Sequence, residues 1–409
     1  MKVLVVTQYF WPESFRINEV VESLMQAGCE VTVLTGQPNY PDGKVYDGYR
    51  ATGWGLEQRR LGPELYRVPL YPRGKGGALK LALNYLSFVL SAALLGPWLL
   101  RGKPFDIVLV YGISPILQAV PAIILKAVKR AVLVTWVQDL WPESLEVTGF
   151  VKSRAALRFV SALVRWIYRR NDLLLVQSRA FIDPVKSMSG GTPVEYHPNP
   201  GEQSLSIGFS GTARSPFTLD PGFNVVFAGN LGAVQALGTI LDAAELLREH
   251  VSIRLVIVGS GSRSDWLTTE VGRRKLSNVR LTGRCTVEAM PAVFEQASAL
   301  LVTLVRSPAM EKTIPSKLQA YLAAGKPVLA CLDGEGARIV EDSGAGLASP
   351  AENAGLLAQA ILRLQSLPPA ELERMGLAGK RYFLEHFEPD VLARKLVKRF
   401  GVLVRRART

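Results

Sequence analysis

Two loops in the first half of the chain combine aromatic rings with carboxylates. Each contains the tetrapeptide Trp-Pro-Glu-Ser, which supplies Trp11 and Glu13 in the first loop and Trp141 and Glu143 in the second. Asp139 lies two residues before the second tetrapeptide. Apolar sugar faces stack on aromatic rings, and sugar hydroxyls donate hydrogen bonds to carboxylates. The two loops therefore predict a carbohydrate site.

The same tetrapeptide has a simpler structural explanation, which the sequence leaves open. Proline and serine are common where a helix begins, and a glutamate in the first turn is stabilised by the helix dipole. This explanation accounts for Pro-Glu-Ser, but not for the paired tryptophans or for Asp139. Arg16 in the first loop, and Asn39 with Tyr40 in a third loop of similar character, complete the residues predicted to contact an acceptor.

Glycine-rich loops in the second half are suited to a phosphate group. Gly229, Asn230 and Gly232 follow one apolar run, and Gly259 and Gly261 follow the next. Glycine lets the backbone approach a ligand, and the N-terminus of the following helix favours an anion. The second loop matches a dinucleotide-binding motif only in part, because the third glycine is absent. A plain turn explains that loop equally well.

A helix near the end of the second half places a lysine in an unfavourable position. The segment Ile314–Val328 predicts a helix with Pro315 at its first position and Gly325 at its end. Lys317 falls in the first turn, where the helix dipole disfavours a cation unless an anion joins it. We therefore expect Ser316 and Lys317 to hold a diphosphate. The alternative is that Lys317 is a solvated surface residue.

These loops need a scaffold that gathers the ends of strands. Short apolar runs alternate with helical periodicity along the chain, which is typical of parallel sheets covered by helices on both faces. Ligands of such sheets bind beyond the carboxyl ends of the strands, where the loops above are placed. We therefore predict an α/β chain with two Rossmann-like domains, whose parallel sheets face each other across a cleft.

The predicted organisation comprises two domains, a linker and a terminal helix. Residues 1–200 form the first domain, which includes an apolar helix over 79–101, and residues 223–388 form the second. The stretch 201–222 is rich in proline, glycine and serine, which predicts a linker. Residues 389–409 are predicted to form a basic C-terminal helix.

Positive charge is concentrated in one part of the chain. The 409 residues carry a net charge of +13, and the segment from Lys44 to Arg170 holds 19 basic and 7 acidic residues. Such a field attracts nucleic acid, anionic lipid or a phosphate-bearing substrate. Cys29, Cys285 and Cys331 are odd in number and far apart, which excludes a disulfide framework. With no Cys/His cluster in the sequence, we expect no metal and no other cofactor.

An uncharged stretch of apolar residues, Leu81 to Leu100, lies inside this basic segment. Such a stretch can span a bilayer, lie on its surface as an interfacial helix, or pack inside a soluble fold. A span is disfavoured because the strands predicted on its two sides, Lys2–Val6 and Phe105–Tyr111, belong to one sheet. The basic and apolar segment Lys152–Arg170 favours the interfacial helix, with the solvated face of a packed helix as the alternative.

Five segments of the chain resemble glycosyltransferase family 4, whose members are retaining enzymes of the GT-B fold. The resemblance is greatest to the bacterial subgroup that builds O-antigen, capsule or colanic-acid-type polysaccharides, including L-fucosamine transferases. It covers nearly the whole chain. The segments are YFWPESFRIN (9–18), NYPDGKVYDGY (39–49), QDLWPES (138–144), AGNLGAVQAL (228–237) and IPSKLQAYLAAGKPV (314–328).

The resemblance implies that the second domain binds a nucleotide diphosphate-sugar and that the first binds the acceptor. Transfer then retains the anomeric configuration and needs no metal, because positive groups and helix N-termini stabilise the departing diphosphate. Asp139 is placed nearest the reacting carbon and orients the acceptor hydroxyl together with Glu143, while Lys317 stabilises the leaving group. The donor-binding set is Gly229, Asn230, Gly232, Gly259, Gly261, Arg284, Arg306, Glu311, Ser316, Lys317, Glu335 and Gly336.

Two features of the family pattern are absent. The two acids of the Glu-x7-Glu motif fall on Lys312 and Ala320, with Glu311 one residue out of register, so the usual ribose-binding carboxylate is missing. The family's basic pair falls on Asn230 and Gln235. The remaining candidate cations for the diphosphate are Arg284, Arg306 and Lys317.

The sequence thus predicts a glycosyltransferase that takes a sugar, an N-acetylated deoxyhexosamine carried on UDP, to a lipid-linked or glycan acceptor. We expect a peripheral, monotopic protein at the cytoplasmic face of the inner membrane. A sugar-nucleotide epimerase on the same fold is disfavoured because it needs a histidine in the cleft. A nucleic-acid binder is disfavoured because the basic residues bracket an apolar helix and no binding motif is present. A non-catalytic nucleotide-sugar binder stays open.

Overall fold

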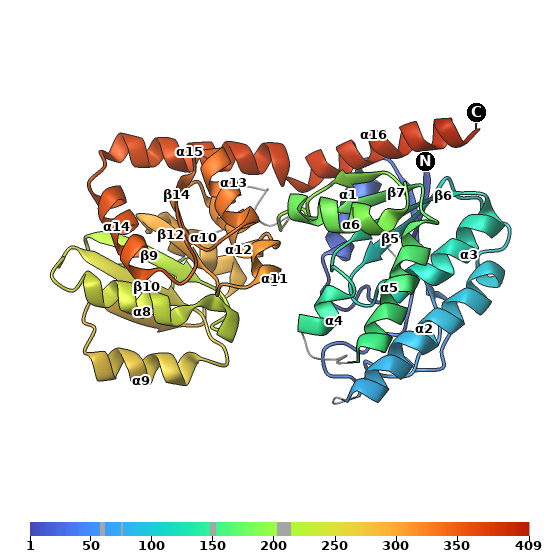
Figure 1. The fold of residues 1–409 in the computed structure, drawn as a ribbon, viewed down its shortest axis with the longest axis horizontal. Coiled ribbons are helices and arrows are strands. Elements are labelled where there is room, and N and C mark those ends of the chain that lie inside the picture. The colour runs from blue at the N-terminus through green and yellow to red at the C-terminus, as the bar shows by residue number, and fades with distance from the viewer. Residues whose placement is uncertain (58–61, 75–76, 148–152, 203–213, 409) are drawn as a thin grey trace. The chain divides into compact units, whose positions relative to one another are not determined.

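The computed structural model divides the chain into two compact units. Unit 1 comprises Met1–Pro200 together with Pro389–Thr409, and unit 2 comprises Gly201–Glu388 (Figure 1). Both are layered α/β structures, as the alternation of strands and helices predicts. The structure describes residues 1–57, 62–74, 77–147, 153–202 and 214–408, so much of the predicted linker lies outside the described residues.

Unit 1 is built on an eight-stranded sheet of order β3-β4-β2-β1-β5-β6-β7-β8. All neighbouring strands run parallel except the edge pair β3 and β4. The strands are β1 (Lys2–Val6), β2 (Glu30–Thr35), β3 (Gly55–Glu57), β4 (Glu64–Arg67), β5 (Ile107–Gly112), β6 (Val132–Val137), β7 (Leu173–Val176) and β8 (Val194–Tyr196).

Helices cover both faces of this sheet because its central strands are apolar on both sides. One face packs against α2 (Ala78–Leu99), α3 (Ala119–Lys129), α5 (Arg154–Tyr168) and α6 (Ile182–Ser189). The other face packs against α1 (Ile17–Gln26) and α16 (Pro389–Arg408). The short helix α4 (Glu143–Val147) and the 3-10 turns Ile116–Gln118 and Arg179–Phe181 complete the unit.

Unit 2 has a six-stranded parallel sheet of order β11-β10-β9-β12-β13-β14. Its strands are β9 (Phe223–Ala228), β10 (Ile253–Val258), β11 (Val279–Gly283), β12 (Ala299–Thr303), β13 (Val328–Cys331) and β14 (Gly346–Ser349). One face packs against α10 (Met290–Glu295), α12 (Ser316–Ala324), α13 (Glu335–Ser343) and α15 (Pro369–His386). The other packs against α8 (Leu237–Leu246), α9 (Ser264–Arg274) and α14 (Ala354–Gln365). The connections contain α11 (Pro308–Glu311) and the 3-10 turns Ala233–Gln235 and Val287–Ala289.

Helix α12 begins one residue later than the sequence suggests. Pro315 is the capping residue before the helix rather than its first position, so Lys317 is the second helical residue. Gly325 ends the helix in the left-handed conformation (φ +68°), as its position in the sequence predicts.

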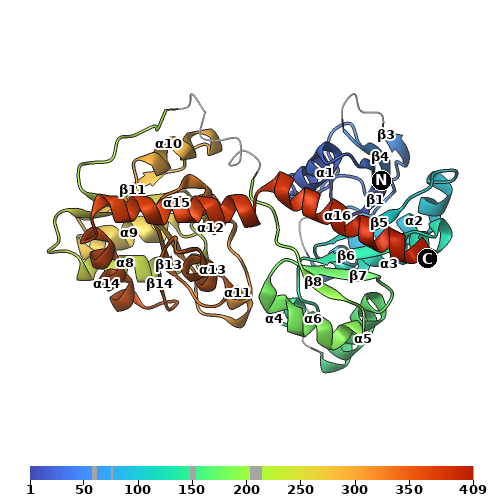
Figure 2. The same ribbon diagram turned by 90° about the horizontal axis from the view of Figure 1, so that it is seen from above.

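The C-terminal helix α16 belongs to the first unit and not to a separate terminal element. It packs against α1 and crosses unit 1, as Figure 2 shows from above. Leu396, Phe400 and Leu403 are buried in the same apolar core as β1 and α1. Arg399 pairs with Glu195, so part of the basic charge that the sequence places at this end is neutralised inside unit 1.

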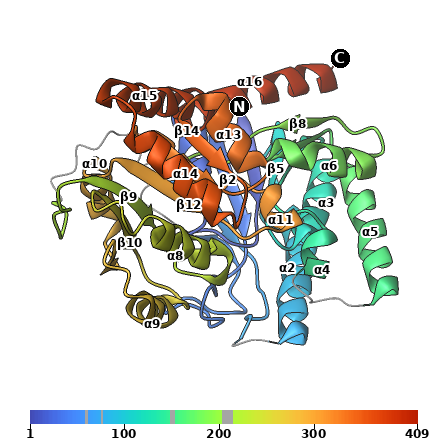
Figure 3. The same cartoon turned by 60° about the vertical axis from the view of Figure 1, so that its left-hand side comes forward.

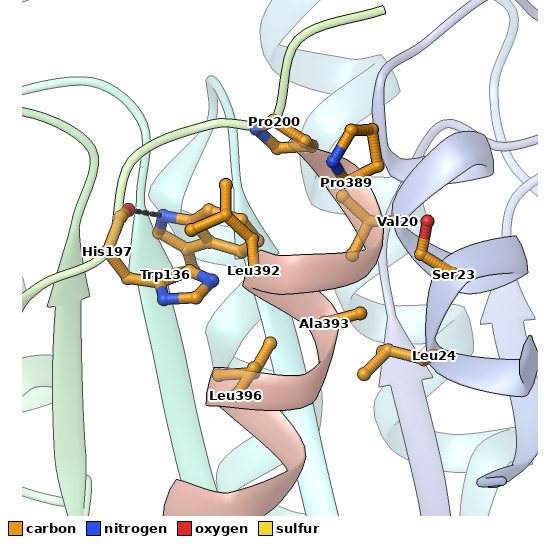
Figure 4. Close-up of a pocket in the computed structure, with 10 residues that line it drawn as sticks. All are labelled: Val20, Ser23, Leu24, Trp136, His197, Pro200, Pro389, Leu392, Ala393 and Leu396. Carbon is orange, nitrogen blue, oxygen red and sulfur yellow. Dashed lines mark hydrogen bonds between the residues drawn. The ribbon is translucent and has the colours of Figure 1, made fainter. Parts of the chain in front are cut away.

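A small apolar pocket, where the first turns of α16 pack on the rest of unit 1, is lined by the buried His197 (Figure 4). The indole N–H of Trp136 donates to the His197 carbonyl oxygen (2.9 Å), and the two rings meet edge to face at 4.8 Å. Burial, with a smaller contribution from the charge of Lys395, lowers the pKa of His197 to about 4. His197 is therefore neutral in the folded protein at pH 7.

The buried His197 should make unit 1 less stable in mild acid. The unfolded chain protonates this histidine below about pH 6.5, whereas the folded protein does so only near pH 4. The free energy of unfolding should therefore fall as pH is lowered through this window, by about 3 kcal/mol in total. His197→Phe should remove this contribution, which denaturant titrations followed by tryptophan fluorescence can measure. The exposed His250 of unit 2 gives a matched control, His250→Phe; equal pH profiles for the two variants would contradict the prediction.

Candidate functional site

A partly buried lysine lies at the carboxyl end of the sheet of unit 2. Lys317 Nζ donates to Gln235 Oε1 (2.6 Å) and stands 3.7 Å from the centre of the Phe227 ring. In the part of the chain that the structure describes, no carboxylate forms an ion pair with this amine. Burial accordingly lowers the pKa of Lys317 to about 7. In the free protein, the charged form of Lys317 therefore lacks a neighbouring anion among the described residues.

Two glycine loops approach this lysine with their backbones. At Gly229 (φ +137°), a Cβ atom would lie 3.2 Å from Lys317 Nζ. At Gly259 (φ +144°), a Cβ atom would lie 1.9 Å from the Gly229 carbonyl oxygen, so no other residue fits there. The Asn230 side chain packs against two further glycines. The structure thus gathers the predicted loop residues Gly229, Asn230, Gly232, Gly259 and Gly261.

The loops before α12 and α13 also meet. A Cβ atom at Gly334 would lie 2.0 Å from the Glu311 carbonyl oxygen, and one at Gly336 would lie 3.3 Å from Pro315 Cδ. The buried carboxylate of Glu335 accepts two hydrogen bonds from Arg338 (2.7 and 2.6 Å). Glu335 therefore has its charge neutralised by an arginine of its own helix.

The two predicted arginines differ from Lys317 in their surroundings. Arg306 Nε donates to Asp333 (3.0 Å), and its backbone N–H donates to Glu352 (3.0 Å). Its charge is therefore partly used within the protein. Arg284 is exposed and directly follows β11. Of the three predicted cations, Lys317 is therefore the one that is partly buried and has no carboxylate partner among the described residues.

In unit 1, the loops after β5 and β6 are joined by Asp139. Its Oδ2 accepts hydrogen bonds from both the backbone N–H and the hydroxyl of Ser114 (2.9 Å each). Trp141 is buried and donates its indole N–H to the Ser114 hydroxyl (3.1 Å). Glu143 begins α4, and its Oε2 is buried without a hydrogen-bond partner among the described residues. Glu143 Oε2 thus keeps an unused hydrogen-bond acceptor.

Glu13 holds the loops after β1 and β2 together. It is buried, and its Oε1 accepts the backbone N–H groups of Asn39 (2.8 Å) and Tyr40 (2.7 Å). Burial raises the pKa of Glu13 to about 7, although these hydrogen bonds act in the opposite direction. Asn39 is also fully buried, whereas Trp11 and Tyr40 are 39% and 37% exposed. Among these predicted acceptor residues, the two aromatic rings are the ones open to solvent.

The two Trp-Pro-Glu-Ser segments have different local structures. The second continues into α4 at Glu143, so the helix-start explanation holds there. The first forms a turn, and α1 begins later, at Ile17. Both Trp–Pro peptide bonds are cis. Arg16 caps this region by donating to the Pro200 carbonyl oxygen (2.6 Å).

Sequence reasoning missed a buried arginine that ties three loops of unit 1. Arg67 pairs with Glu57 and donates to the carbonyl oxygens of Gly36 (2.8 Å) and Trp11 (2.6 Å). A charged residue at the end of the run ELYRV was the available signal. It also missed Asn84, a buried amide inside the apolar helix α2. Among the described residues, no group of three His, Cys, Asp or Glu is placed to hold a metal.

Comparison with known proteins gives the same assignment for both units. Residues 14–200 match the glycosyl transferase 4-like domain, and residues 222–366 match the glycosyl transferases group 1 model. The chain is 28% identical over 341 residues to the putative colanic acid biosynthesis glycosyl transferase WcaI of Escherichia coli K12, covering 80% of this chain and 82% of that protein.

Solved structures with the same fold are also glycosyltransferases. Sucrose-phosphate synthase from Thermosynechococcus elongatus has a TM-score of 0.71 at 16% identity, over 99% of each chain. Anabaena HepE, solved in complex with UDP, has a TM-score of 0.67 at 14% identity, over 98% of this chain and 100% of that one. The fold is therefore GT-B, and the chain belongs to glycosyltransferase family 4.

Proposed function

We propose that this glycosyltransferase takes its sugar from a UDP-sugar bound in unit 2. The observation that carries the proposal is Lys317, an amine without a carboxylate partner, held between the Phe227 ring and Gln235 at the start of α12. A diphosphate would supply the missing anion, and the backbone N–H groups of the loops around Gly229 and Gly259 would share its charge. UDP in the related HepE structure supports the choice of nucleotide.

The chemistry follows from where negative charge develops. As the bond from the sugar to the diphosphate breaks, charge accumulates on the leaving phosphate oxygens, and donors already aimed at them lower the barrier. Lys317 takes this role. Because its pKa is about 7 in the free protein, binding of the diphosphate favours uptake of a proton by the amine.

We assign the acceptor to unit 1. Glu143, with an unpartnered buried oxygen, orients the acceptor hydroxyl, and Asp139 lies nearest the reacting carbon. The exposed rings of Trp11 and Tyr40 stack on the acceptor sugar. Similarity to WcaI supports a role in colanic-acid-type polysaccharide biosynthesis. We further propose an N-acetylated deoxyhexosamine as the sugar, retention of its configuration, and no metal.

The acceptor is proposed to be lipid-linked because unit 1 has a surface suited to an anionic bilayer. Helix α2 is the one helix among the described residues long and apolar enough to cross a membrane, and most of it is not buried. The strands on its two sides belong to one sheet, which argues against a membrane span. Its exposed side chains share one face and are 42–76% exposed: Leu79, Leu83, Leu86, Leu90, Leu94 and Trp98.

The neighbouring helices add positive charge to this apolar face. Figure 3 shows α2, α3 and α5 beside one another on unit 1. Helix α5 has no acidic residue, carries the exposed arginines Arg154, Arg158 and Arg165, and also exposes Phe159 and Trp166. Each such cation contributes about 1 kcal/mol of attraction to an anionic leaflet. We propose that this surface, formed by α2, α3 and α5, docks on the cytoplasmic face of the inner membrane.

Loss of the Lys317 amine should abolish donor binding. UDP should raise the melting temperature of the wild-type protein more than GDP, dTDP, ADP or CMP does. In Lys317→Met the UDP shift should vanish, and the transfer rate should fall by a factor of about 10²–10³. Lys326→Met, beyond the other end of α12, is the matched control and should preserve both. A loss of only a few fold in Lys317→Met would remove this residue from the mechanism.

The same site should respond to pH. UDP affinity should weaken between about pH 7 and pH 9, because the free Lys317 amine loses its proton there. Lys317→Arg keeps its charge throughout and should flatten this profile.

NMR of the product's anomeric proton tests whether transfer retains the configuration of the sugar.

Membrane binding should have an apolar contribution from α2 and an electrostatic contribution from α5, and only the second should depend on salt. Leu86→Gln combined with Leu90→Gln and Leu94→Gln should release the protein from phosphatidylglycerol-containing vesicles at any salt concentration. Replacing Arg158 and Arg165 by glutamine should weaken binding mainly at low salt. The exposed leucines of α15 provide the control, Leu377→Gln with Leu384→Gln. Wild-type protein that stays in solution with these vesicles would contradict the docking surface.

A further inference from the structure

The inner face of α2 carries a polar residue that fixes the helix over two strand ends. Asn84 is fully buried, and its Oδ1 accepts a hydrogen bond from Gln8 Nε2 (2.7 Å). Its Nδ2 donates to Tyr71 O (2.7 Å) and to Asn39 Oδ1 (3.2 Å). Gln8 follows β1 and Asn39 follows β2. The helix with the apolar outer face is thus attached at the edge where the acceptor residues lie.

The next residue of α2 brings a hydroxyl to this edge. Tyr85 is near the buried Tyr9 and the charges of Arg73 and Asp139, all of which affect the pKa of its hydroxyl. Burial raises the pKa of both tyrosines above the ordinary value. Both hydroxyls keep their protons at neutral pH; that of Tyr9 is directed to Asn84 Oδ1 (3.5 Å), which leaves the Tyr85 hydroxyl to donate to an anion.

An aromatic cluster forms the floor beside Tyr85. Tyr9 stacks on Phe15 with ring centres 5.0 Å apart, and Tyr40 packs against Phe15 at 5.1 Å. The partly exposed Tyr40 ring holds the Arg73 guanidinium at 5.3 Å from its centre. Arg73 is also fixed through its backbone N–H, which donates to Asn39 Oδ1 (3.1 Å).

The charge of Arg73 is left without a partner in the described part of the chain. No ion pair there includes it, whereas the nearby Arg67 pairs with Glu57. The two acids that face this cluster are already engaged: Glu13 accepts backbone N–H groups, and Asp139 accepts from Ser114. Both carboxylates are therefore held by hydrogen bonds from a neighbouring loop. The Arg73 guanidinium, which lies over the Tyr40 ring, therefore remains without a carboxylate partner among the described residues.

We propose that Arg73 and Tyr85 bind a phosphate group carried by the acceptor, and that Tyr40 stacks on the sugar attached to it. The inference rests on the proposed function and deepens it by naming the acceptor's chemistry. A guanidinium and a phenol O–H supply charge-assisted hydrogen bonds to phosphate oxygens. A neutral glycan would leave Arg73 without an anion, so a phosphate-linked acceptor fits the cluster better.

The position of Tyr85 favours a lipid as the source of that phosphate. The residue that follows it, Leu86, is 49% exposed on the outer apolar face of α2. One turn of this helix therefore carries both a bilayer contact and a phosphate contact. The phosphate of a lipid-linked sugar lies at the bilayer surface, while its hydrocarbon stays in the membrane. Such a molecule could reach Arg73 and Tyr85 without leaving the bilayer.

The soluble arm of the test uses glucose 1-phosphate and glucose, titrated into the full chain by calorimetry. The wild-type protein should bind glucose 1-phosphate at least about tenfold more tightly than glucose. Arg73→Gln should lose this preference, and Tyr85→Phe should weaken it. Arg101→Gln is the matched control, since Arg101 stacks on Trp98 at the other end of α2. Lys317→Met should keep glucose 1-phosphate binding and lose UDP binding, so the two sites fail separately.

The lipid arm uses neutral phosphatidylcholine vesicles with and without farnesyl phosphate. Recruitment by farnesyl phosphate that is lost in Arg73→Gln supports a lipid-borne phosphate. An effect confined to glucose 1-phosphate supports the phosphate site with a soluble sugar phosphate as its ligand. A denaturant transition like that of the wild-type protein, followed by tryptophan fluorescence, confirms that unit 1 of Arg73→Gln is folded. Unchanged binding of both probes in this folded variant overturns the proposal.

Discussion

The structure depends on one constraint of parallel sheets: each strand must be followed by a segment that crosses a face of the sheet before the next parallel strand begins. The carboxyl ends of neighbouring strands therefore meet at one edge, whatever their distance in sequence. In unit 1 this constraint brings Glu13 to Tyr40 and Asp139 to Ser114. In unit 2 it brings the glycine loops after β9 and β10 to the start of α12. Strand order, more than local sequence, selects which side chains can act together.

The buried and partly buried ionisable groups fall into two kinds, which differ in whether the fold itself neutralises or pairs them. Glu13 is buried but receives two backbone N–H groups, and His197 is buried in its neutral form. The hydrogen bonds to Glu13 and the neutral form of His197 both limit the free-energy cost of burying these groups. Lys317 and Arg73 are held in place without a carboxylate among the described residues. Each of these cations lies against an aromatic ring, Phe227 for Lys317 and Tyr40 for Arg73, and the proposals above assign an arriving anion to both.

The sequence predicted the central strands and the α/β class because near-continuous Val, Ile and Leu runs are required in a doubly covered parallel sheet. It did not predict β3, β4, β8 or β14, which have three or four residues each and no long apolar run. It also left α16 apart from unit 1, because the contacts of Phe400 with the core depend on tertiary packing. The place of Lys317 in the first turn of α12 was predicted from the sequence, whereas its role as a diphosphate ligand stays a prediction. The pairing of Arg306 with Asp333 was not predicted, because it joins residues from different loops.

Helix α2 shows why composition alone gave three readings of one segment. A stretch of this length without charges is compatible with a span, an interfacial helix or a buried helix. The sheet decides against the span, because the strands on both sides of α2 lie in the same sheet. Each of the other two interpretations fits one face of the helix. Phe88 and Ala92 are buried in the core, as in a buried helix, whereas Leu90 and Leu94 are exposed, as in an interfacial helix. Asn84 and Tyr85 explain why the first turns are not purely apolar, since they attach the helix to the strand ends. In the proposals above, the outer face of this helix meets the bilayer while its inner face holds the strand ends of unit 1.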